Sequence, residues 1–473
     1  MTVQSALGRG FDDFAVGEIA EISRIVTPDD LYVFAHVSGN LNPLNLPCSE
    51  SVATDAAPAP SMWLGSLFSA VLGNLLPGPG TLYEGQTLNF HDRAHVGDHL
   101  HISVEVLEKR PPDTMGLATR VRRGTDLLVD GTAVVHAPLQ ALATLDVVLP
   151  ELHLSRHMHV ARLLSACHPL PPMATAVVAP EEESALLGAL SAARANLITP
   201  ILIGNAAVIA RIAAEHGVSL EGIAVEDTPS DDAAAARGVA MVLEGRAVAI
   251  MKGHLHTDVL LRHVVKSQGG LRIGRRISHV FVMDAPSLSE LLLVTDAAIN
   301  IAPTLEEKVD IVQNAIDLAH ALGLKLPKVG ILSAVETVNP KIPSTLDAAA
   351  LSKMSERGQI RGAIVDGPLA MDNAISLSAA RTKGLKSLVA GRADILVVPN
   401  IEAGNILAKE LTYAAQAEGA GLVLGARVPI MLTSRADDEA SRMFSCAVAV
   451  LYAHWQASGE SAVPPWRLTE AAE

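Results

Sequence analysis

A repeated pattern that begins near residue 175 limits the folds open to this chain. Short apolar runs recur as far as residue 432, and several are separated by alanine-rich stretches with helical spacing. Uninterrupted apolar runs are typical of strands buried on both faces, and their alternation with helices predicts a parallel sheet covered on each side. The runs are 175–179, 200–203, 247–251, 280–283, 291–294, 329–332, 363–365, 395–398 and 429–432, and the helical stretches are 181–194, 205–216 and 305–322.

The part of the chain before residue 138 has a different pattern. Residues 61–76 are apolar, with small and large side chains mixed, and the Pro-Gly-Pro-Gly sequence at 77–80 predicts a turn that ends this helix. Alternating apolar and polar residues predict antiparallel strands over 82–90, 100–107, 117–121 and 127–137. A long apolar helix against such a sheet is an α+β layer arrangement.

These patterns divide the 473 residues into domains. We predict an α+β domain over 1–138, a linker over 139–159, an α/β domain over 160–457 and a loose tail over 458–473. Three histidines in the linker have no acid or cysteine that would complete a metal site with them, so we favour packing on a neighbouring element; they are His153, His157 and His159.

Composition excludes several classes of function. The chain has 36 Lys and Arg against 51 Asp and Glu, a net charge of −15, and only 7 Phe, 4 Tyr and 3 Trp. It therefore lacks the basic surface and the stacking platforms that nucleic acid requires. Its 3 cysteines lie far apart, as expected of free thiols in a reducing cytoplasm. We find no signal peptide and no uninterrupted apolar segment long enough to span a membrane, so we expect a cytoplasmic protein.

Polar and cationic residues follow four of the predicted strands, at 251–258, 295–300, 333–345 and 433–437. Open α/β sheets bind ligands at the carboxyl ends of their strands, so we expect these clusters to converge on one edge. Cations, hydroxyls and loop amides together suit an anion, most simply a phosphate. A single cluster is weak evidence for a binding site, because a Lys or Arg after a strand is often a solvated surface charge.

No cofactor motif accompanies these clusters. The sequence has no GxxxxGK[ST] loop, and residues 270–274 do not form GxGxxG, so neither ATP nor NAD is supported. His254 and His256 form an HxH pair, for which a structural hydrogen bond is the simpler interpretation than a metal. We expect neither a metal nor a bound cofactor.

Seven motifs from residue 250 to residue 437 resemble the phosphate acetyl/butyryltransferase family. The resemblance implies a two-subdomain fold like that of isocitrate and isopropylmalate dehydrogenases, with the active site in the cleft. It also implies the reaction acyl-CoA + phosphate ⇌ acyl phosphate + CoA, most simply with acetyl-CoA and without a metal or cofactor. The motifs are IMKGHLHTD (250–258), RRISHVFVMD (275–284), TDAAINIAP (295–303), ILSAVETVNPKIPSTLDA (331–348), VDGPLAMDNA (365–374), GRADILVVPNIEAGN (391–405) and ARVPIMLTSRAD (426–437).

The last motif holds the predicted catalytic residues. Arg435 is a planar, bidentate donor that suits phosphate, and Ser434 can donate to the oxyanion of the transition state. Simple acetyltransferases of this type place an aspartate seven residues after the motif serine, where this chain has Ser441. Asp437 is therefore our candidate base for the CoA thiol, with a helix-capping role as the alternative.

Other residues are predicted to contact phosphate or CoA by their position. The cations among them could instead be partners in structural ion pairs. The set is Lys252, His256, Thr257, Arg276, Lys341 and Ser344.

Residues 11–137 resemble a MaoC-like hot-dog domain, the fold of R-specific enoyl-CoA hydratases. Hydratases of that family carry Ser-Gly-Asp-x-Asn-Pro-Leu-His, in which Asp and His activate water, whereas residues 38–45 here are Ser-Gly-Asn-Leu-Asn-Pro-Leu-Asn. Asn40 and Asn45 do not titrate, and Pro60 replaces the histidine of the second signature, Ala-His-Gly-Met. The domain is predicted to have lost hydration and to serve dimerisation or to hold a pantetheine arm.

The whole chain therefore resembles a fused enoyl-CoA hydratase/phosphate acetyltransferase whose hydratase half lacks its catalytic residues. We expect small-molecule substrates and a homo-oligomer, at least a dimer. Two alternatives stay open: a non-catalytic protein that binds acyl-CoA or acyl phosphate, and a bifunctional enzyme that hydrates through another base.

Overall fold

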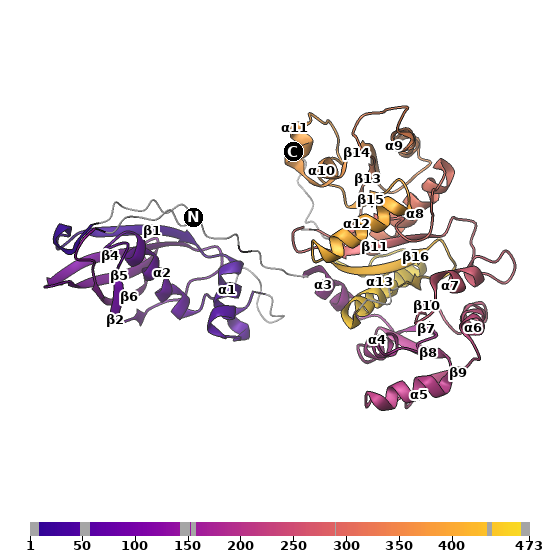
Figure 1. Ribbon diagram of the computed structural model, residues 1–473, viewed down its shortest axis with the longest axis horizontal. Coiled ribbons are helices and arrows are strands. Elements are labelled where there is room, and N and C mark those ends of the chain that lie inside the picture. The colour runs from indigo at the N-terminus through magenta and orange to yellow at the C-terminus, as the bar shows by residue number, and fades with distance from the viewer. Residues whose placement is uncertain are drawn as a thin grey trace. The chain divides into compact units, whose positions relative to one another are not determined.

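The structure is a computed structural model that describes residues 9–47, 57–141, 152, 158–288, 290–432 and 438–464. The chain divides into two compact units, Met1–Leu154 and Ser155–Glu473, each of which is described by itself (Figure 1). Among the described helices, none combines the length and apolar character needed to cross a bilayer.

The first unit is an antiparallel sheet packed on one apolar helix, as predicted. Helix α2 (Ser61–Asn74) buries Trp63, Leu64, Leu67, Phe68, Val71 and Leu72. The longest strand alternates, so that Leu100, Ile102, Val104 and Val106 point into the same core. The sheet has the order β1-β4-β5-β6-β2 with β3 on β6, and its strands are β1 (Ile19–Ile25), β2 (Leu82–Gln86), β3 (Asn89–Phe90), β4 (His99–Arg110), β5 (Thr114–Arg123) and β6 (Asp126–His136).

The run predicted as one strand over 82–90 is divided into β2 and β3. Both segments pair with β6, and the chain bends between them, where the Thr87 carbonyl lies against Gly131 of β6. A Cβ on Gly131 would lie 1.9 Å from that oxygen, so only glycine permits the bend.

Two further elements of this unit were not predicted from the sequence, β1 and helix α1 (Pro28–Ser38). The cap of α1 is nevertheless visible in the sequence, because Thr27 and Asp30 form a capping box around Pro28. Gly39 ends the helix with a φ of 73° and turns the chain into the loop that carries Asn40 and Asn45.

The second unit contains an eleven-stranded sheet in the order β14-β13-β15-β12-β11-β16-β17-β10-β7-β8-β9. Every predicted apolar run from residue 175 onward corresponds to one of these strands. They are β7 (Met173–Val178), β8 (Ile198–Gly204), β9 (Ala224–Asp227), β10 (Ala249–Lys252), β11 (Ser278–Asp284), β12 (Leu292–Thr295), β13 (Lys328–Leu332), β14 (Ile364–Leu369), β15 (Ile395–Val397), β16 (Glu418–Leu424) and β17 (Ile430–Met431).

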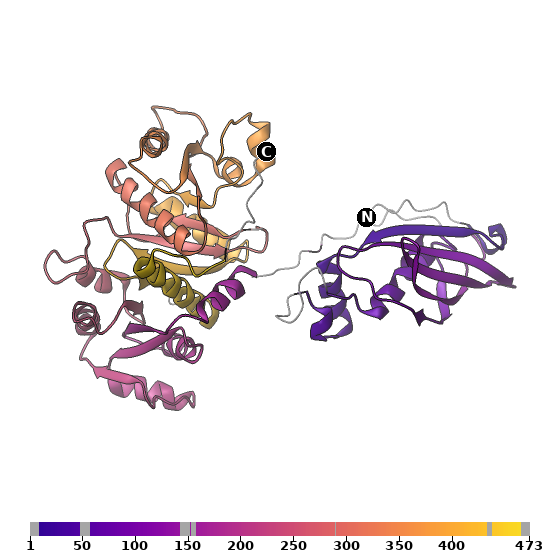
Figure 2. The ribbon, with the colours of Figure 1, turned by 180° about the vertical axis from the view of Figure 1, so that it is seen from behind.

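Helices cover both faces of this sheet. On β12, Leu293 belongs to the core that includes α8 and α13, whereas Leu292 and Val294 belong to the core that includes α10, α11 and α12. Figures 1 and 2 show the sheet from opposite sides. The helices are α3 (Met158–Cys167), α4 (Glu183–Arg194), α5 (Ala206–Glu215), α6 (Asp231–Leu243), α7 (Thr257–Val264), α8 (Leu305–Ala321), α9 (Pro343–Glu356), α10 (Met371–Ile375), α11 (Leu377–Thr382), α12 (Ile401–Tyr413) and α13 (Glu439–Ser458).

The expectation of a wholly parallel sheet is wrong, because β11 and β16 are antiparallel to their neighbours in the middle of it. The short connection over 285–291 allows only an antiparallel neighbour, since parallel strands need a crossover of about a dozen residues or more. Strand β16 was missed because Gly419 and Gly421 weaken its strand pattern.

The mixed sheet also changes where the polar clusters lie. Strands β10 and β17 run parallel to each other, but they run opposite to β12, β13 and β15. The cluster after β10 therefore begins at one end of the sheet and those after β12 and β13 begin at the other, although Ala298 and Ile299 of the β12 cluster pack against the same core as Leu255 of the β10 cluster. The cluster at 433–437 lies outside the described residues. Strand direction alone thus does not place the described clusters on one edge.

The core of the first unit gives a stability prediction. Phe68 is fully buried at the centre of α2, so Phe68→Ala should lower the free energy of unfolding of that unit by about 3–5 kcal/mol. Met62 lies on the same helix and is 60% exposed, so Met62→Ala should change it by about 0.5 kcal/mol or less. Urea unfolding of the full chain measures both, followed by tryptophan fluorescence in a Trp455→Phe, Trp466→Phe background that leaves Trp63 as the reporter. Equal effects would contradict the packing described.

Candidate functional site

The predicted catalytic residues Ser434, Arg435 and Asp437 lie outside the described residues. The residues on either side of this segment are described. Leu432 directly follows β17, and Asp438 caps α13 by accepting a hydrogen bond from the backbone N–H of Ser441, at 2.9 Å. Ser441, at the position of the aspartate in simple acetyltransferases, therefore lies in the first turn of α13.

Lys252 ends the strand next to β17. The register pairs Ile250 with Ile430 and Met251 with Met431, so Lys252 lies beside Leu432 at the same end of the two strands. Its side chain is only 4% exposed, and its Nζ donates to the carbonyl of Gly253 at 3.1 Å. The structure thus buries Lys252 beside the end of β17.

His256 and Thr257 continue from Lys252 into helix α7. His256 is the exposed N-cap residue, without a side-chain capping bond, and Thr257 is the first, half-buried residue of the helix. His254 is also exposed. These residues thus lie on the loop that leaves the β10 end, as predicted.

The described part of the chain contains no group of three or more His, Cys, Asp or Glu residues that could hold a metal ion. Of the three linker histidines, His153 and His157 lie outside the described residues. The backbone N–H of His159 donates to Asp284 at 3.0 Å.

Arg276 is placed with the other group of predicted residues, beside the carboxyl end of β12. Its Nε donates to Asn300 at 2.7 Å, and its Nη1 pairs with Glu307 at 3.0 Å. Asn300 in turn donates to Asp296, whose carboxylate also accepts backbone N–H groups from 298, 299 and 300. The structure therefore gives Arg276 the structural partners that were the alternative to substrate contact.

Asp296 was not among the predicted residues, although its motif was recognised. It is 3% exposed, and burial raises the pKa of its carboxyl group against the opposing effect of its hydrogen bonds. The N–H groups that donate to its carboxylate belong to the loop after β12, so these hydrogen bonds fix the conformation of that loop.

Lys341 and Ser344 lie on the loop and helix that follow β13. Lys341 is exposed, and the hydroxyl of Ser344 lies 2.8 Å from that of Ser333. The strand directions thus bring Arg276, Lys341 and Ser344 to one end of the sheet, and Lys252, His256 and Thr257 to the other.

A buried histidine on β11 was also missed. His279 is 0% exposed and stacks edge-on against Phe281, with 4.3 Å between ring centroids. Burial lowers the pKa of its imidazole to about 3, and the backbone of Leu432 opposes that shift. The signal available in the sequence was a histidine inside an otherwise apolar strand.

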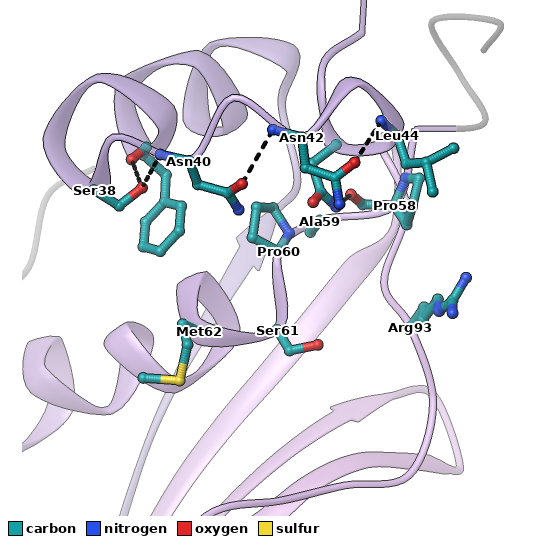
Figure 3. A pocket seen from close by; sticks show the side chains of 12 residues that line it. Ser38, Asn40, Asn42, Leu44, Pro58, Ala59, Pro60, Ser61, Met62 and Arg93 are labelled. Atoms are coloured by element: carbon teal, nitrogen blue, oxygen red, sulfur yellow. Dashed lines mark hydrogen bonds between the residues drawn. The ribbon is translucent and has the colours of Figure 1, made fainter. Parts of the chain in front are cut away.

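The first unit has a cavity of about 420 Å³ at the mouth of the α1 loop (Figure 3). Asn40, Asn45 and Pro60, the three positions that the sequence analysis compared with hydratase signatures, all line this one cavity. Arg93 contributes a guanidinium to the lining.

The amides of this cavity are used to shape its wall. Asn40 accepts from the N–H of Asn42 at 3.1 Å, and Asn42 from the N–H of Leu44 at 3.1 Å. Asn45 donates to the carbonyl of Pro58 at 2.7 Å. Such side chains hydrogen-bond but neither take up nor release a proton in the working pH range.

The family model described as phosphate acetyl/butaryl transferase matches residues 229–450. The phosphate acetyltransferase of Rhizobium meliloti is 59% identical over 292 residues, which are 62% of this chain and 92% of that protein. The chain belongs to the phosphate acetyl/butaryl transferase family.

A solved family structure supports the fold of the second unit. A branched-chain phosphotransacylase from Enterococcus faecalis V583 is 32% identical, with a TM-score of 0.53, over 60% of this chain and 99% of that one. The R-hydratase PhaJ1 from Pseudomonas aeruginosa, with a TM-score of 0.31, is 35% identical over 32% of this chain and 99% of that one.

The matched range of the family model includes Lys252, His279 and residues 433–437, and it excludes the first unit. The matched range therefore covers the strands from β10 to β17 and the loops that follow them. It does not account for the cavity around Asn40.

The buried imidazole makes a prediction about acid stability. Because the pKa of His279 is about 3 in the folded chain and about 6.5 when unfolded, only the unfolded chain takes up this proton between those values. Its contribution to the free energy of unfolding is complete above about pH 6.5 and decreases as the pH falls. Lowering the pH from 6 to 4 should reduce the wild-type free energy of unfolding by about 2 kcal/mol through this group. His279→Gln should abolish that reduction.

Urea unfolding of the full chain at several pH values measures this difference. The control is His168→Gln, which removes an imidazole that is exposed rather than buried. If the free energy of unfolding of His279→Gln depended on pH as in the wild type, the imidazole would not be buried in its neutral form.

Proposed function

We propose that the second unit transfers an acyl group between CoA and phosphate, acyl-CoA + phosphate ⇌ acyl phosphate + CoA, by direct transfer in a ternary complex. The observation that carries this proposal is the 59% identity to a phosphate acetyltransferase over 92% of its length. Acetyl-CoA is the proposed substrate. The retained Ser434 and Arg435, and the buried Lys252 beside the end of β17, agree with it.

In the forward direction, a phosphate oxygen attacks the thioester carbonyl, and the CoA thiolate leaves. Arg435 is proposed to hold the phosphate through two parallel hydrogen bonds, and Ser434 to donate to the carbonyl oxygen as it becomes negative. Lys252 would add a local positive charge. In the reverse direction, Asp437 would take the proton of the CoA thiol before that sulfur attacks the acyl phosphate.

We propose that the remaining predicted residues contact the substrates from the two opposite ends of the sheet. His256 and Thr257 would serve the Lys252 end, whereas Lys341, Ser344 and the solvent-facing side of Arg276 would reach a substrate from the other. A two-subdomain arrangement like that of isocitrate and isopropylmalate dehydrogenases would allow both, with the site in the cleft. The two oppositely directed groups of parallel strands are consistent with two subdomains.

The first unit is proposed to serve oligomerisation or CoA binding, without hydratase activity, in a cytoplasmic homo-oligomer of at least two chains. Asn40 and Asn45 carry this part of the proposal, because they line the cavity and cannot take the place of the carboxylate and imidazole that a hydratase needs. Asn40 is labelled in Figure 3. The whole chain would then be a fused enzyme with one active half.

Arg435→Ala should lower kcat/KM for phosphate by roughly a hundredfold or more, because a bidentate, charge-assisted contact to the anion is lost. The assay follows thiol release from acetyl-CoA in the presence of phosphate. Arg211→Ala is the control, since Arg211 is exposed on α5 and pairs only with Glu215 among the described residues.

An unchanged phosphate dependence in Arg435→Ala would remove that residue from the site. If the wild-type chain released no thiol from acetyl-, propionyl- or butyryl-CoA, the result would favour a non-catalytic binding protein. Ser441 at the aspartate position is the observation that would then explain the loss.

The first unit should leave crotonyl-CoA unchanged, because neither amide can activate water. The loss of absorbance of the conjugated thioester is the measurement, and a flat trace is expected. Asn40→Asp combined with Asn45→His should also stay inactive, since Pro60 and Ser61 alter the surrounding wall. Hydration by the wild-type chain would contradict this assignment.

A further inference from the structure

The cavity of the first unit has a wall without a carboxylate. Among the described residues no Asp or Glu lines it, and its polar wall consists of Ser38, Asn40, Asn42, Asn45, Ser61 and Arg93. One amide of this wall is already used, because Nδ2 of Asn45 donates to the carbonyl of Pro58 at 2.7 Å. The groups that remain are mostly hydrogen-bond donors, so no charge in the described wall repels an anion.

The backbone fixes which way two of these amides face. Oδ1 of Asn40 accepts the N–H of Asn42, and Oδ1 of Asn42 accepts the N–H of Leu44, both at 3.1 Å. A backbone N–H bonds only to the oxygen of a side-chain amide, so each Nδ2 is left as a donor. Neither Nδ2 makes a hydrogen bond to a described residue, and Figure 3 shows both nitrogens on the Pro60 side of the loop.

Helix α2 supplies further donors to the same cavity. Ser61 and Met62, its first two residues, line the cavity, and the helix begins without a side-chain cap. The N–H groups of an uncapped first turn have no partner inside the helix and carry a partial positive charge. The hydroxyl of Ser61 points to the side on which Arg93 lies in Figure 3, and within the described ranges it makes no hydrogen bond.

Arg93 adds a full positive charge to the lining. Its guanidinium forms no ion pair or hydrogen bond in the part of the chain that the structure describes. The adjacent carboxylate is engaged elsewhere, since Asp92 pairs with Arg123 at 3.1 Å. Arg93 is also exposed, so its long side chain can turn over the mouth of the cavity without losing a bond. A planar guanidinium binds the oxygens of a phosphate in pairs.

We propose that this cavity binds a short-chain acyl phosphate as a ligand and not as a substrate. The inference rests on the proposed function, because an acyl phosphate is the product of the second unit. The phosphoryl group has several terminal oxygens, which suit the guanidinium of Arg93, the hydroxyl of Ser61 and the two free amides. The acyl chain lies on the apolar wall, which includes Phe34 and Met62. Neither Asn40 nor Asn45 takes up a proton, so the ligand is held unchanged.

Calorimetric titration of the full chain with acetonylphosphonate tests the proposal. In this stable analogue of acetyl phosphate a CH2 group replaces the bridging oxygen, so the analogue is neither hydrolysed nor transferred. The wild type should bind one molecule in each unit. Arg93→Ala should weaken the site in the first unit at least about tenfold, because a charge-assisted contact is lost, and should leave the other site unchanged.

Two further substitutions test the charge of the wall, each with a matched control. Arg122→Ala removes an exposed arginine of the same unit that does not line the cavity, so both sites should keep their affinity. Asn40→Asp keeps the oxygen that accepts from Asn42 but adds a negative charge, and it should weaken the first site at least about tenfold. Gln140→Glu adds the same charge at an exposed position outside the cavity and should change that affinity less than about twofold.

Hydrogen exchange followed by mass spectrometry locates the bound analogue. In the wild type and in Arg122→Ala it should slow exchange in peptides that cover 38–46 and 58–64, because a ligand that binds only the folded state suppresses local opening. In Arg93→Ala the same peptides should exchange as without the analogue. Protection confined to the second unit would overturn the proposal.

Inorganic phosphate and CoA are the competing ligands in the same titrations. Phosphate should bind the first site at least about threefold more weakly than the analogue, because it makes no contact with the apolar wall. CoA should leave the analogue bound in the first unit. Equal affinity for phosphate, or displacement of the analogue from the first unit by CoA, would overturn the assignment to an acyl phosphate.

The outcomes for the two units are separable. If the wild-type chain releases no thiol from acetyl-CoA, the proposed function fails, whereas the comparison of Arg93→Ala with Arg122→Ala still decides whether the cavity binds the analogue. Equal affinities of the first site in these two variants would overturn the proposal, whatever the assay of the second unit shows.

Discussion

The antiparallel pairing of β11 with β16 is the interaction on which the second unit depends. Seven residue pairs, from Ser278 with Leu424 to Asp284 with Glu418, join two groups of strands that run in opposite directions. Without this pairing, the groups around β10 and β12 would be separate sheets. It also places β16 between β11 and β17, where Gly421 can contact both the end of β17 and helix α13.

The chemistry proposed for this unit depends on local charge rather than on the charge of the whole protein. A chain with a net charge of −15 repels phosphate and CoA at long range, but salt screens that repulsion over about 10 Å. A buried cation such as Lys252 acts at shorter range, where the effective dielectric constant is lower.

The two units show different relations between sequence and chemistry. The second unit matches 92% of the length of a phosphate acetyltransferase at 59% identity. The first unit has a cavity whose wall is shaped by amides, with Asn40 and Asn45 tied into its turns by hydrogen bonds.

Much of this architecture follows from the sequence alone, because burial on one face or on both leaves a periodic pattern. That pattern located α2, the apolar strands and the carboxyl ends where Lys252 and Ser344 lie, and the motifs located Asn40 and Asn45 in one cavity. The directions of the strands were decided only by the tertiary structure, since an apolar run is equally apolar in either direction. The same is true of β16, whose place in the sheet comes from pairing with strands that are distant in the chain, which no local pattern records.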